Sequence, residues 1–378
     1  MPPNPQSPVS SLYEDILMQR RQFARTLLGL PLASAISSAA SAAETPAPLT
    51  MPPGGSIADV PGIKVGHHTR ADRPTGCTVI LCESGAMAGV DVRGSAPGTR
   101  ETDLLNPINF VQQVNAIVLS GGSAYGLDTA SGVMRWLEER KAGFKIGSLG
   151  VVPIVPAAIL MDLGVGDFKI RPTAEDGYSA CNAARADAVA EGNVGAGAGA
   201  TVGKMFGPGF AMKSGLGTSS ISVGGVVVGA IVAVNAVGDV VDPASGRIVA
   251  GARSDNGKGF RNSMNAVLNG YGVSPMHGAN TTIGCIATNA AFAKTEMTKI
   301  AQMTHDGYAR AINPVHTMSD GDTIFALSTG TATVRADVSA VGAIAAVVME
   351  RAIIRAAMQA TSLPDLHLPA YKDYTAQR

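Results

Sequence analysis

A glycine-rich segment runs into an apolar one in His277-Gly-Ala-Asn280-Thr281-Thr282-Ile283-Gly284-Cys285-Ile286-Ala287. The β-branched and small residues predict a buried strand over 282–290, which begins directly after a residue that carries a hydroxyl. If Thr281 Oγ attacks the carbonyl carbon of Asn280, an N-to-O acyl shift gives an ester that water can hydrolyse. The new Thr281 then has an α-amine beside its own hydroxyl, and such an amine titrates at about 8 and can act as a base. Asn280 suits this position because asparagine tolerates strained backbone, although Asn-Thr-Thr by itself is more often only the start of a strand.

The segments around this junction alternate between strand and helix patterns. Strands are predicted at 77–82, 87–92, 115–121, within 221–241 on both sides of Gly224-Gly225, and at 323–328. Helices are predicted at 127–141, 180–190, 294–312 and 338–360, and a long irregular stretch covers 242–280. Two groups of strands with helices outside each fit an α/β sandwich, and the absence of a regular βαβ repeat counts against a doubly wound fold or a barrel.

Composition narrows the partners that the chain can bind. The 378 residues contain 29 basic and 29 acidic residues, so nothing favours a nucleic acid as partner. Aromatic residues make up only 4% of the chain, which argues against a base- or sugar-stacking surface. The longest apolar stretch, Gly224 to Val237, is about 14 residues long and too short to span a membrane. We therefore expect a small-molecule or short-peptide substrate, with no nucleic acid and no membrane as partner.

Cysteine and histidine spacing predicts no metal and no cofactor. The four cysteines form no C-x-x-C pair, and Cys77 and Cys82 would point to opposite faces of one strand. We expect all four to be small buried apolar residues. The six histidines show no H-E-x-x-H or other ligand spacing.

The N-terminal residues have the layout of an export signal. Arg20-Arg21 precede a weakly apolar run from Leu27 to Ile36, and Ala40-Ser41-Ala42 offers a cleavage site. These features predict a twin-arginine signal over 1–43 and hence a periplasmic or exported protein. The alternative is a basic tail that happens to contain an arginine pair. A proline-rich linker, 44–56, follows, and a single domain is expected over 57–378.

Short motifs spread along the chain carry a family resemblance. Asn280-Thr281-Thr282-Ile283, Ala287-Thr288-Asn289-Ala290 and Asp320-Gly321-Asp322-Thr323 resemble the DmpA-type family of self-processing N-terminal-nucleophile hydrolases. That family includes the L-aminopeptidase/D-esterases, the β-peptidyl aminopeptidases and the nylon-oligomer (6-aminohexanoate oligomer) endohydrolases. Further matches, in family order, are Asp59-Val-Pro-Gly-Ile-Lys-Val-Gly66, Thr75-Gly-Cys-Thr-Val79, Leu119-Ser-Gly-Gly-Ser-Ala-Tyr-Gly-Leu127 and Gly195-Ala-Gly-Ala-Gly199 leading to Gly203-Lys204. The similarity spans about Ile57 to Met358.

This resemblance implies a fold, a processing site and an assembly. The fold is an αββα sandwich, cleaved after Asn280 into an α chain, 44–280, and a β chain, 281–378. Several such heterodimers, commonly four, assemble into a homo-oligomer.

The resemblance also implies the site residues around the nucleophile Thr281, which are Lys204, Asn235, Asp320 and Asp322. Tyr125 is carried over as a substrate-pocket residue. Met161 occupies the place where the nylon-oligomer hydrolases have a tyrosine, whereas the Asp-Gly-Asp turn brings the chain nearer to those hydrolases.

Each of these residues can have a catalytic role, and Lys204 and Asn235 can instead have a purely structural one. Lys204 follows a glycine-rich run, where a cation can lower the pKa of a neighbouring amine, but it can also be a surface lysine after a turn. The Asn235 amide can donate to an oxyanion, or it can be a turn residue before Gly238. Asp320 and Asp322 can orient the Thr281 amine, and their mutual repulsion raises one pKa.

The expected function is therefore amide hydrolysis through an acyl-Thr281 intermediate. Substrates are short peptides, β- or D-amino acid amides, or ω-amino acid oligomers such as 6-aminohexanoate oligomers. Two alternatives stay open. One is acyl transfer of the ornithine acetyltransferase type, in which an amine replaces water. The other is a processed but non-catalytic binding protein, given Met161.

Overall fold

The computed structural model describes residues 49–271 and 280–375, and the predicted export signal lies outside the described residues. The main strands are β1 (Lys64–Thr69), β2 (Gly76–Val92), β3 (Thr99–Arg100), β4 (Gln113–Ser120), β7 (Ala157–Ile159), β10 (Leu216–Val223), β11 (Val226–Asn235), β14 (Thr281–Thr288) and β16 (Thr323–Ser328). They are hydrogen-bonded in the order β10-β11-β14-β16-β2-β4-β7-β3, and β1 pairs with β2.

Strand β2 connects two layers of strands. Its first part, 76–81, pairs with β1 and β4, whereas 87–92 pairs with β16, and the register with β4 shifts between Leu81 and Ala86. We call β10, β11, β14, β16 and the second part of β2 sheet A, and β1, the first part of β2, β4, β7 and β3 sheet B. The two short strands predicted at 77–82 and 87–92 are thus one long strand that passes from sheet B to sheet A.

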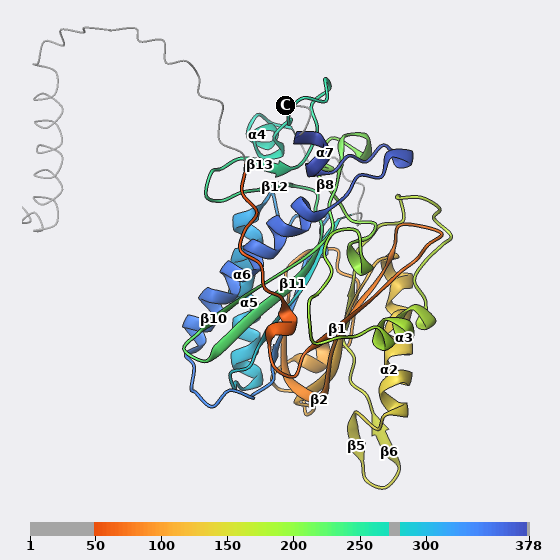
Figure 1. Ribbon diagram of the computed structural model, residues 1–378, viewed down its shortest axis with the longest axis vertical. Helices are drawn as coiled ribbons and strands as arrows, with labels where there is room; N and C mark the ends of the chain where they lie inside the picture. Colours follow the sequence, from red (N-terminus) through yellow and green to blue (C-terminus); the bar gives the residue numbers. More distant parts are fainter. Residues whose placement is uncertain (1–48, 272–279, 376–378) are drawn as a thin grey trace, which may run out of the picture. The chain divides into compact units, whose positions relative to one another are not determined.

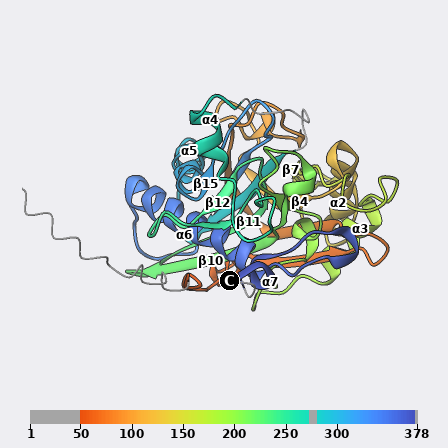
Figure 2. The same cartoon turned by 90° about the horizontal axis from the view of Figure 1, so that it is seen from above.

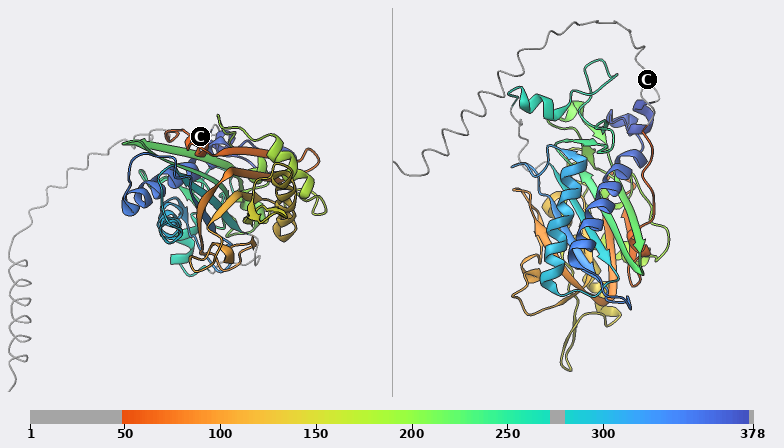
Figure 3. Two further views of the ribbon diagram at one scale, coloured as in Figure 1. Left: turned by 90° about the horizontal axis from the view of Figure 1, so that it is seen from below. Right: turned by 90° about the vertical axis from the view of Figure 1, so that its left-hand side faces the viewer.

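Helices cover the outer face of each sheet (Figures 1 and 2). Helices α5 (Lys294–Ala311) and α6 (Val338–Gln359) lie side by side over sheet A (Figure 3). Helices α2 (Thr129–Glu139) and α3 (Ala174–Asn182) lie on sheet B. The order helix, sheet, sheet, helix confirms the expected αββα sandwich.

Three apolar cores between these layers follow from the two-residue period of the strands. Ile80 and Ile231 point between the sheets, where they share one core with Ile283. Their strand neighbours Val79 and Val232 point outward, the first toward α2 and the second toward α5 and α6. Strands β4, β11, β14 and β16 are buried along nearly their whole length, and their sequences are therefore almost continuously apolar or small.

The cysteines illustrate the same alternation. Cys77 lies in the core between sheet B and its helices, and Cys82 lies in the core between the sheets. All four cysteines are buried and free. The prediction of opposite faces and no disulfide is confirmed.

One predicted helix is wrong in its position. The alanine-rich segment 180–190 predicted a helix, but α3 begins at Ala174 with a capping box between Thr173 and Asp176 and ends at Asn182. The chain then pairs with the edge of the sheet, because the Arg185 N–H donates to Val65 O at 2.9 Å and the Val65 N–H donates back at 2.8 Å. These tertiary hydrogen bonds outweigh the helix propensity of alanine.

The remaining elements are short. They are β5 (Phe144–Ile146), β6 (Gly150–Val152), β8 (Thr201–Val202), β9 (Met212–Lys213), β12 (Asp239–Val241), β13 (Ile248–Ala250), β15 (Ile312–Asn313), α4 (Ser263–Leu268), α7 (Tyr371–Thr375) and six 3₁₀ turns. Two of them, β13 and α4, fall in the stretch expected to be irregular. Within residues 49–271 and 280–375, no helix is long and apolar enough to cross a membrane.

Candidate active site

Thr281 is the first residue of β14 and is only 2% exposed. It pairs with Asn235 at the end of β11, while Ile283 pairs with Thr323 at the start of β16. Strand β11 pairs antiparallel with β14, and β16 pairs parallel with it, so the end of β11 and the turn before β16 both lie beside Thr281. Sheet pairing thus gathers the predicted residues 235, 281, 320 and 322 at one end of sheet A.

The carbonyl group of Asn280 lies between two donors. The Thr281 hydroxyl donates to Asn280 O, and the Gly321 N–H donates to the same oxygen at 3.1 Å. A Cβ at position 321 would come within 2.9 Å of Thr281 Oγ1 and 2.6 Å of Ala96 O. Only glycine therefore allows this turn to approach the hydroxyl and the carbonyl so closely.

Lys204 reaches Thr281 through Asn235. Its Nζ donates to both the backbone and the side-chain oxygen of Asn235, each at 2.9 Å. Burial lowers the pKa of Lys204 to about 7, and the nearby charges of Asp320 and Asp162 counteract this only in part. At neutral pH a substantial fraction of Lys204 is therefore uncharged.

Asn235 is fully buried, and both ends of its amide are held. Its Oδ1 also accepts the Thr201 N–H at 3.0 Å, and its Nδ2 donates to Met161 O at 3.1 Å. Met161 thus contributes its backbone carbonyl to the site. The sequence suggested Met161 through its side chain, and this backbone role could not be read from residue type.

The two carboxylates of the Asp-Gly-Asp turn have different partners. Asp320 accepts the Thr317 hydroxyl at 2.5 Å and the Val237 N–H at 3.4 Å. Burial, followed by the charge of Asp322, raises the pKa of Asp320 to about 6. Asp322 Oδ1 accepts the Thr282 N–H at 2.7 Å.

The other oxygen of Asp322 binds His316, a residue that no sequence motif indicated. His316 Nδ1 lies 2.8 Å from Asp322 Oδ2, and the His316 N–H donates to the same oxygen at 3.1 Å. Thr317 was missed in the same way. The Thr317–Asp320 spacing is the only sequence signal for either residue, since it is typical of a local hydroxyl-to-carboxylate turn.

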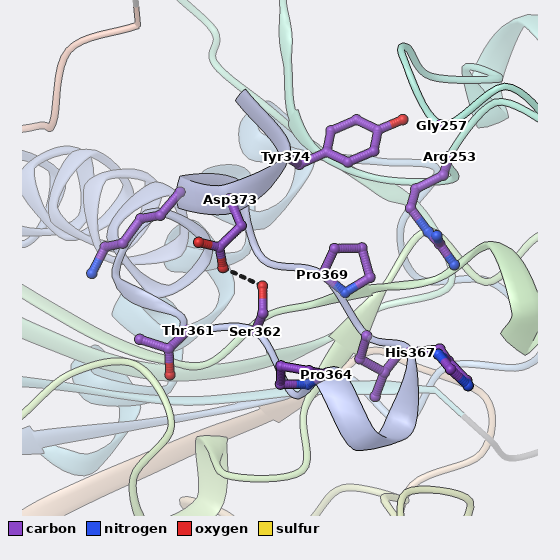
Figure 4. A pocket seen from close by; sticks show the side chains of 11 residues that line it. Arg253, Gly257, Thr361, Ser362, Pro364, His367, Pro369, Asp373 and Tyr374 are labelled. Atoms are coloured by element: carbon purple, nitrogen blue, oxygen red, sulfur yellow. Dashed lines mark hydrogen bonds between the residues drawn. The ribbon is translucent and has the colours of Figure 1, made fainter. Parts of the chain in front are cut away.

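A cavity of about 430 Å³ opens beside the scissile bond. It is lined by Met161, Asp162, Gly164, Val165, Gly166, Thr201, Lys204, Gly207, Pro208, Ala211, Val237, Asn280, Leu366 and Leu368. A cavity of about 700 Å³ lies nearby (Figure 4), but none of the predicted site residues lines it. We therefore take the smaller cavity as the candidate substrate pocket.

Tyr125 does not line this pocket. It lies in the 3₁₀ turn Ser123–Asp128, is 56% exposed, and stacks under the Arg171 guanidinium at 3.7 Å. Ser123 is the first residue of that turn, which Gly122 precedes in a left-handed conformation. In the described part of the chain, no three His, Cys, Asp or Glu side chains group as a metal site would require.

Comparison with known proteins identifies the family. The model of peptidase family S58 matches residues 55–367. An uncharacterized aminopeptidase of Mycobacterium leprae (strain TN) is 45% identical over 350 residues, which cover 84% of this chain and 94% of that protein. A 6-aminohexanoate-oligomer endohydrolase of Kocuria sp. (strain KY2) is 33% identical over 323 residues, covering 79% and 85%.

Two solved structures share the fold. A Burkholderia sp. β-aminopeptidase superposes with a TM-score of 0.62 at 21% identity, covering 87% of this chain and 96% of that one. The L-aminopeptidase D-Ala-esterase/amidase of Ochrobactrum anthropi, described as a variant of the Ntn-hydrolase fold, gives 0.63 at 20% identity, covering 87% and 94%. The αββα sandwich and these matches show that the chain belongs to peptidase family S58, the DmpA-type hydrolases, and is an enzyme of the aminopeptidase and amidase kind.

Proposed function

We propose that the chain cuts its own Asn280–Thr281 bond and then hydrolyses amide bonds with Thr281 as the nucleophile. The observation that carries this proposal is the contact between the Thr281 hydroxyl and the Asn280 carbonyl, which also accepts the Gly321 N–H. A nucleophile, its electrophile and an oxyanion donor thus already lie together in the uncut chain.

Self-cleavage proceeds in two steps. Thr281 Oγ attacks the Asn280 carbonyl carbon, the C–N bond breaks, and the amide nitrogen takes up a proton to become the Thr281 amine. The Gly321 N–H, 3.1 Å from the carbonyl oxygen, stabilises the negative charge that develops on it. Water then hydrolyses the ester between Asn280 and Thr281 Oγ, which leaves a carboxylate on Asn280.

Turnover of a substrate repeats this chemistry with the new amine as base. The Thr281 amine takes the hydroxyl proton, Oγ attacks the substrate carbonyl, and the protonated amine returns the proton to the leaving nitrogen. Because Asp322 accepts the neighbouring Thr282 N–H at 2.7 Å, the carboxylate pair lies next to the amine and can hold it. In this proposal Lys204 tunes the basicity of the amine and Asn235 donates to the oxyanion, and their mutual bond at 2.9 Å supports a joint role.

The substrates that we propose are short peptides, β- or D-amino acid amides, and ω-amino acid oligomers such as 6-aminohexanoate oligomers. Support comes from two kinds of relative, one named as an aminopeptidase and the other as a 6-aminohexanoate-oligomer endohydrolase. Assays with a β-alanyl dipeptide and with a 6-aminohexanoate oligomer separate these classes. An N-acetylornithine assay separates hydrolysis from acyl transfer.

Processing is tested on a denaturing gel. We expect two fragments, and N-terminal sequencing of the smaller one should begin at Thr281. Thr281→Ala should remain a single chain without activity, whereas Thr281→Ser retains a hydroxyl and should still be cut. A Thr281→Ala chain that is cut at the same bond would contradict the proposal.

We also propose that the protein is exported through its twin-arginine segment and assembles into a homo-oligomer of cleaved heterodimers. Support for assembly comes from the β5–β6 hairpin, whose Phe144, Ile146, Leu149 and Val152 are 37, 39, 88 and 43% exposed. Such an apolar patch is unusual for a surface that stays in water. Light scattering on Leu149→Asp should show smaller particles than the wild type, and a reporter fused to residues 1–43 tests export.

A further inference from the structure

His316 holds one of the two carboxylates that lie next to the nucleophile. Its Nδ1 lies 2.8 Å from Asp322 Oδ2, and its backbone N–H donates to the same oxygen at 3.1 Å. The other oxygen, Asp322 Oδ1, accepts the Thr282 N–H at 2.7 Å. The side chains of His316 and Asp322 are only 16% and 1% exposed. Because water is largely excluded from the pair, each hydrogen bond to the carboxylate is stronger than it would be on the surface.

The surroundings of the His316 ring favour a proton on Nδ1. A neutral imidazole has one N–H donor and one acceptor nitrogen. His316 Nε2 is buried and has no hydrogen-bond partner among the residues that the structure describes. A proton on Nε2 would therefore leave a buried donor unpaired and would turn the lone pair of Nδ1 toward a carboxylate oxygen. With the proton on Nδ1, His316 donates to Asp322 through both its ring and its backbone.

Two side chains of helix α5 hold the ring in this orientation. His305 meets it edge-on, with the ring centroids 4.8 Å apart, and Tyr308 stacks beside it with the centroids 6.0 Å apart. Both residues are fully buried. His305 is itself attached to strand β2, since its Nε2 lies 3.1 Å from Asp91 O. The His316 ring therefore cannot rotate away from the carboxylate without disturbing the packing of α5.

The backbone of His316 is also unusual. Its φ angle is 55°, in the left-handed region that residues with a side chain rarely adopt, although asparagine, aspartate and histidine do so more often than others. Such a conformation persists only where its surroundings hold it, and it is found preferentially at functional sites. Here the residue in this conformation directs two donors to one carboxylate oxygen.

The carboxylate of Asp322 is bonded to the end of strand β14 that carries the nucleophile. At this end, Asn280 O accepts the Gly321 N–H at 3.1 Å, and the Thr282 N–H donates to Asp322 at 2.7 Å. After cleavage, only the second of these two bonds belongs to the chain that begins at Thr281. A free chain end loses its order unless other groups hold it. The Asp322 carboxylate thus attaches the new N-terminus to the turn before β16.

We infer that His316 is a positioning residue for amide hydrolysis, because it fixes the carboxylate that holds the end of β14 and, with it, Thr281. This inference rests on the proposed function of Thr281 as the nucleophile. His316 acts only through Asp322, so it contributes orientation and takes no proton from Thr281 or the substrate. Without it, the carboxylate can turn about its Cβ–Cγ bond and release the Thr282 N–H. Thr281 then shifts against the oxyanion donor Gly321, and a shift of about 1 Å in such a site costs about a hundredfold in rate.

Two substitutions separate a positioning role from a packing role. His316→Phe keeps an aromatic ring between His305 and Tyr308 but removes the Nδ1 donor. His316→Asn removes the ring, but its amide nitrogen takes the place of Nδ1 as a donor. Asparagine also tolerates the left-handed backbone at this position. If His316 positions Asp322, the asparagine variant should be the more active one, whereas a role in packing alone predicts the opposite order.

The variants and the wild type are compared in the turnover of an amino-acid anilide, with rates expressed per cleaved chain as measured on a denaturing gel. His316→Phe should lower kcat about ten- to a hundredfold, the effect of losing a hydrogen bond to a charged group. Its KM should stay within about twofold of the wild type, because the bond orients the nucleophile and does not bind the substrate. His316→Asn should recover most of the lost kcat.

The outcomes distinguish this inference from the proposed function. If a variant remains uncut, self-cleavage of all three chains on a timed gel replaces turnover, and the same order of wild type, asparagine and phenylalanine is expected. A phenylalanine variant as fast as the wild type, or an asparagine variant as slow as the phenylalanine one, would overturn the inference alone. A wild-type chain that is neither cut nor active would instead refute the proposed function.

Nitrogen NMR of the histidine side chains gives a readout that does not depend on activity. The experiment uses the Thr281→Ala chain, and the His316 signals are identified among those of the six histidines by their loss in His316→Asn. We expect His316 Nδ1 to carry a proton and its signal to shift when Asp322→Asn is introduced. A His316 ring protonated on Nε2 alone would contradict the inference, because it could not donate to Asp322.

Discussion

Replacement of Arg73 by methionine tests how the pocket wall is held. The guanidinium donates to Val165 O and Ile170 O, each at 2.8 Å, and to the backbone and side chain of Asp162. One side chain thus joins several points of the loop 162–170 that borders the pocket. The variant removes all of these bonds and leaves the carboxylate of Asp162 with two donors, the Thr75 hydroxyl and the Gly122 N–H.

The expected loss of stability follows from the burial of the Arg73–Asp162 ion pair. Both side chains are 0% exposed, so Asp162 would remain a buried charge without its ion-pair partner. Removal of one partner from such a pair costs about 3–5 kcal/mol, whereas replacement of both by apolar side chains is often close to neutral. We therefore expect Arg73→Met to lower the free energy of unfolding by about 3–5 kcal/mol and Arg73→Met/Asp162→Leu to recover much of this loss.

Urea denaturation of the Thr281→Ala chain, which should stay a single polypeptide, measures these differences. Arg135→Met, which breaks the exposed pair with Glu175, is the control and should leave the urea midpoint close to that of the parent. If Arg73→Met lowered the free energy of unfolding as little as the control does, the reasoning would be refuted. So would a double variant less stable than the single one, because the pair would then not be coupled.

Three further outcomes follow from the site. Gly321→Ala should slow self-cleavage severely, since its Cβ would lie 2.9 Å from Thr281 Oγ1, whereas Gly209→Ala, with nothing within 4 Å, should be cut at the normal rate on a timed gel. NMR of the lysine ε-carbons should show Lys204 titrating with a pKa of about 7. Asp320→Asn should lower this pKa further, because the charge of Asp320 raises it. A Lys204 pKa near 10.5 would contradict the burial of its amine. In the unfolded chain the Lys204 amine keeps its proton up to a pH of about 10.5, whereas in the folded chain it loses that proton at about 7. Lys204 should therefore make the free energy of unfolding of the wild type rise between these two pH values. In urea denaturation, Lys204→Met should flatten this rise.

Elements and layers were predictable from the sequence wherever apolar periodicity is strong. Strand β14 and helices α5 and α6 lie within about two residues of their predicted bounds, the usual uncertainty at element ends. The predicted helix at 180–190 failed because hydrogen bonds between Arg185 and Val65, distant in sequence, decide the conformation there. Local propensity carries no information about such a partner.

The candidate site was predictable only in part. Pairing of β11 with β14 and of β14 with β16 brings Asn235 and the Asp-Gly-Asp turn to Thr281, as the motif order implied. The His316–Asp322 contact and the Met161 carbonyl were not predictable. Both depend on loop conformation and on backbone atoms, for which residue type gives no signal. Tyr125, carried over from the motif alone, lies outside the pocket.

The position of the Asp162 side chain explains why two of the sequence motifs contain glycine. A Cβ at Gly121 would lie 2.2 Å from Asp162 Oδ2, and one at Gly199 would lie 2.7 Å from Asp162 Cβ. The two glycines are 78 positions apart in sequence, yet each leaves space for the same buried side chain, which Thr75 and Arg73 hold from a third segment. The glycines of these two motifs thus accommodate the carboxylate that fixes the pocket wall. Substitution of either glycine should therefore disturb the candidate substrate pocket, although neither residue lines it.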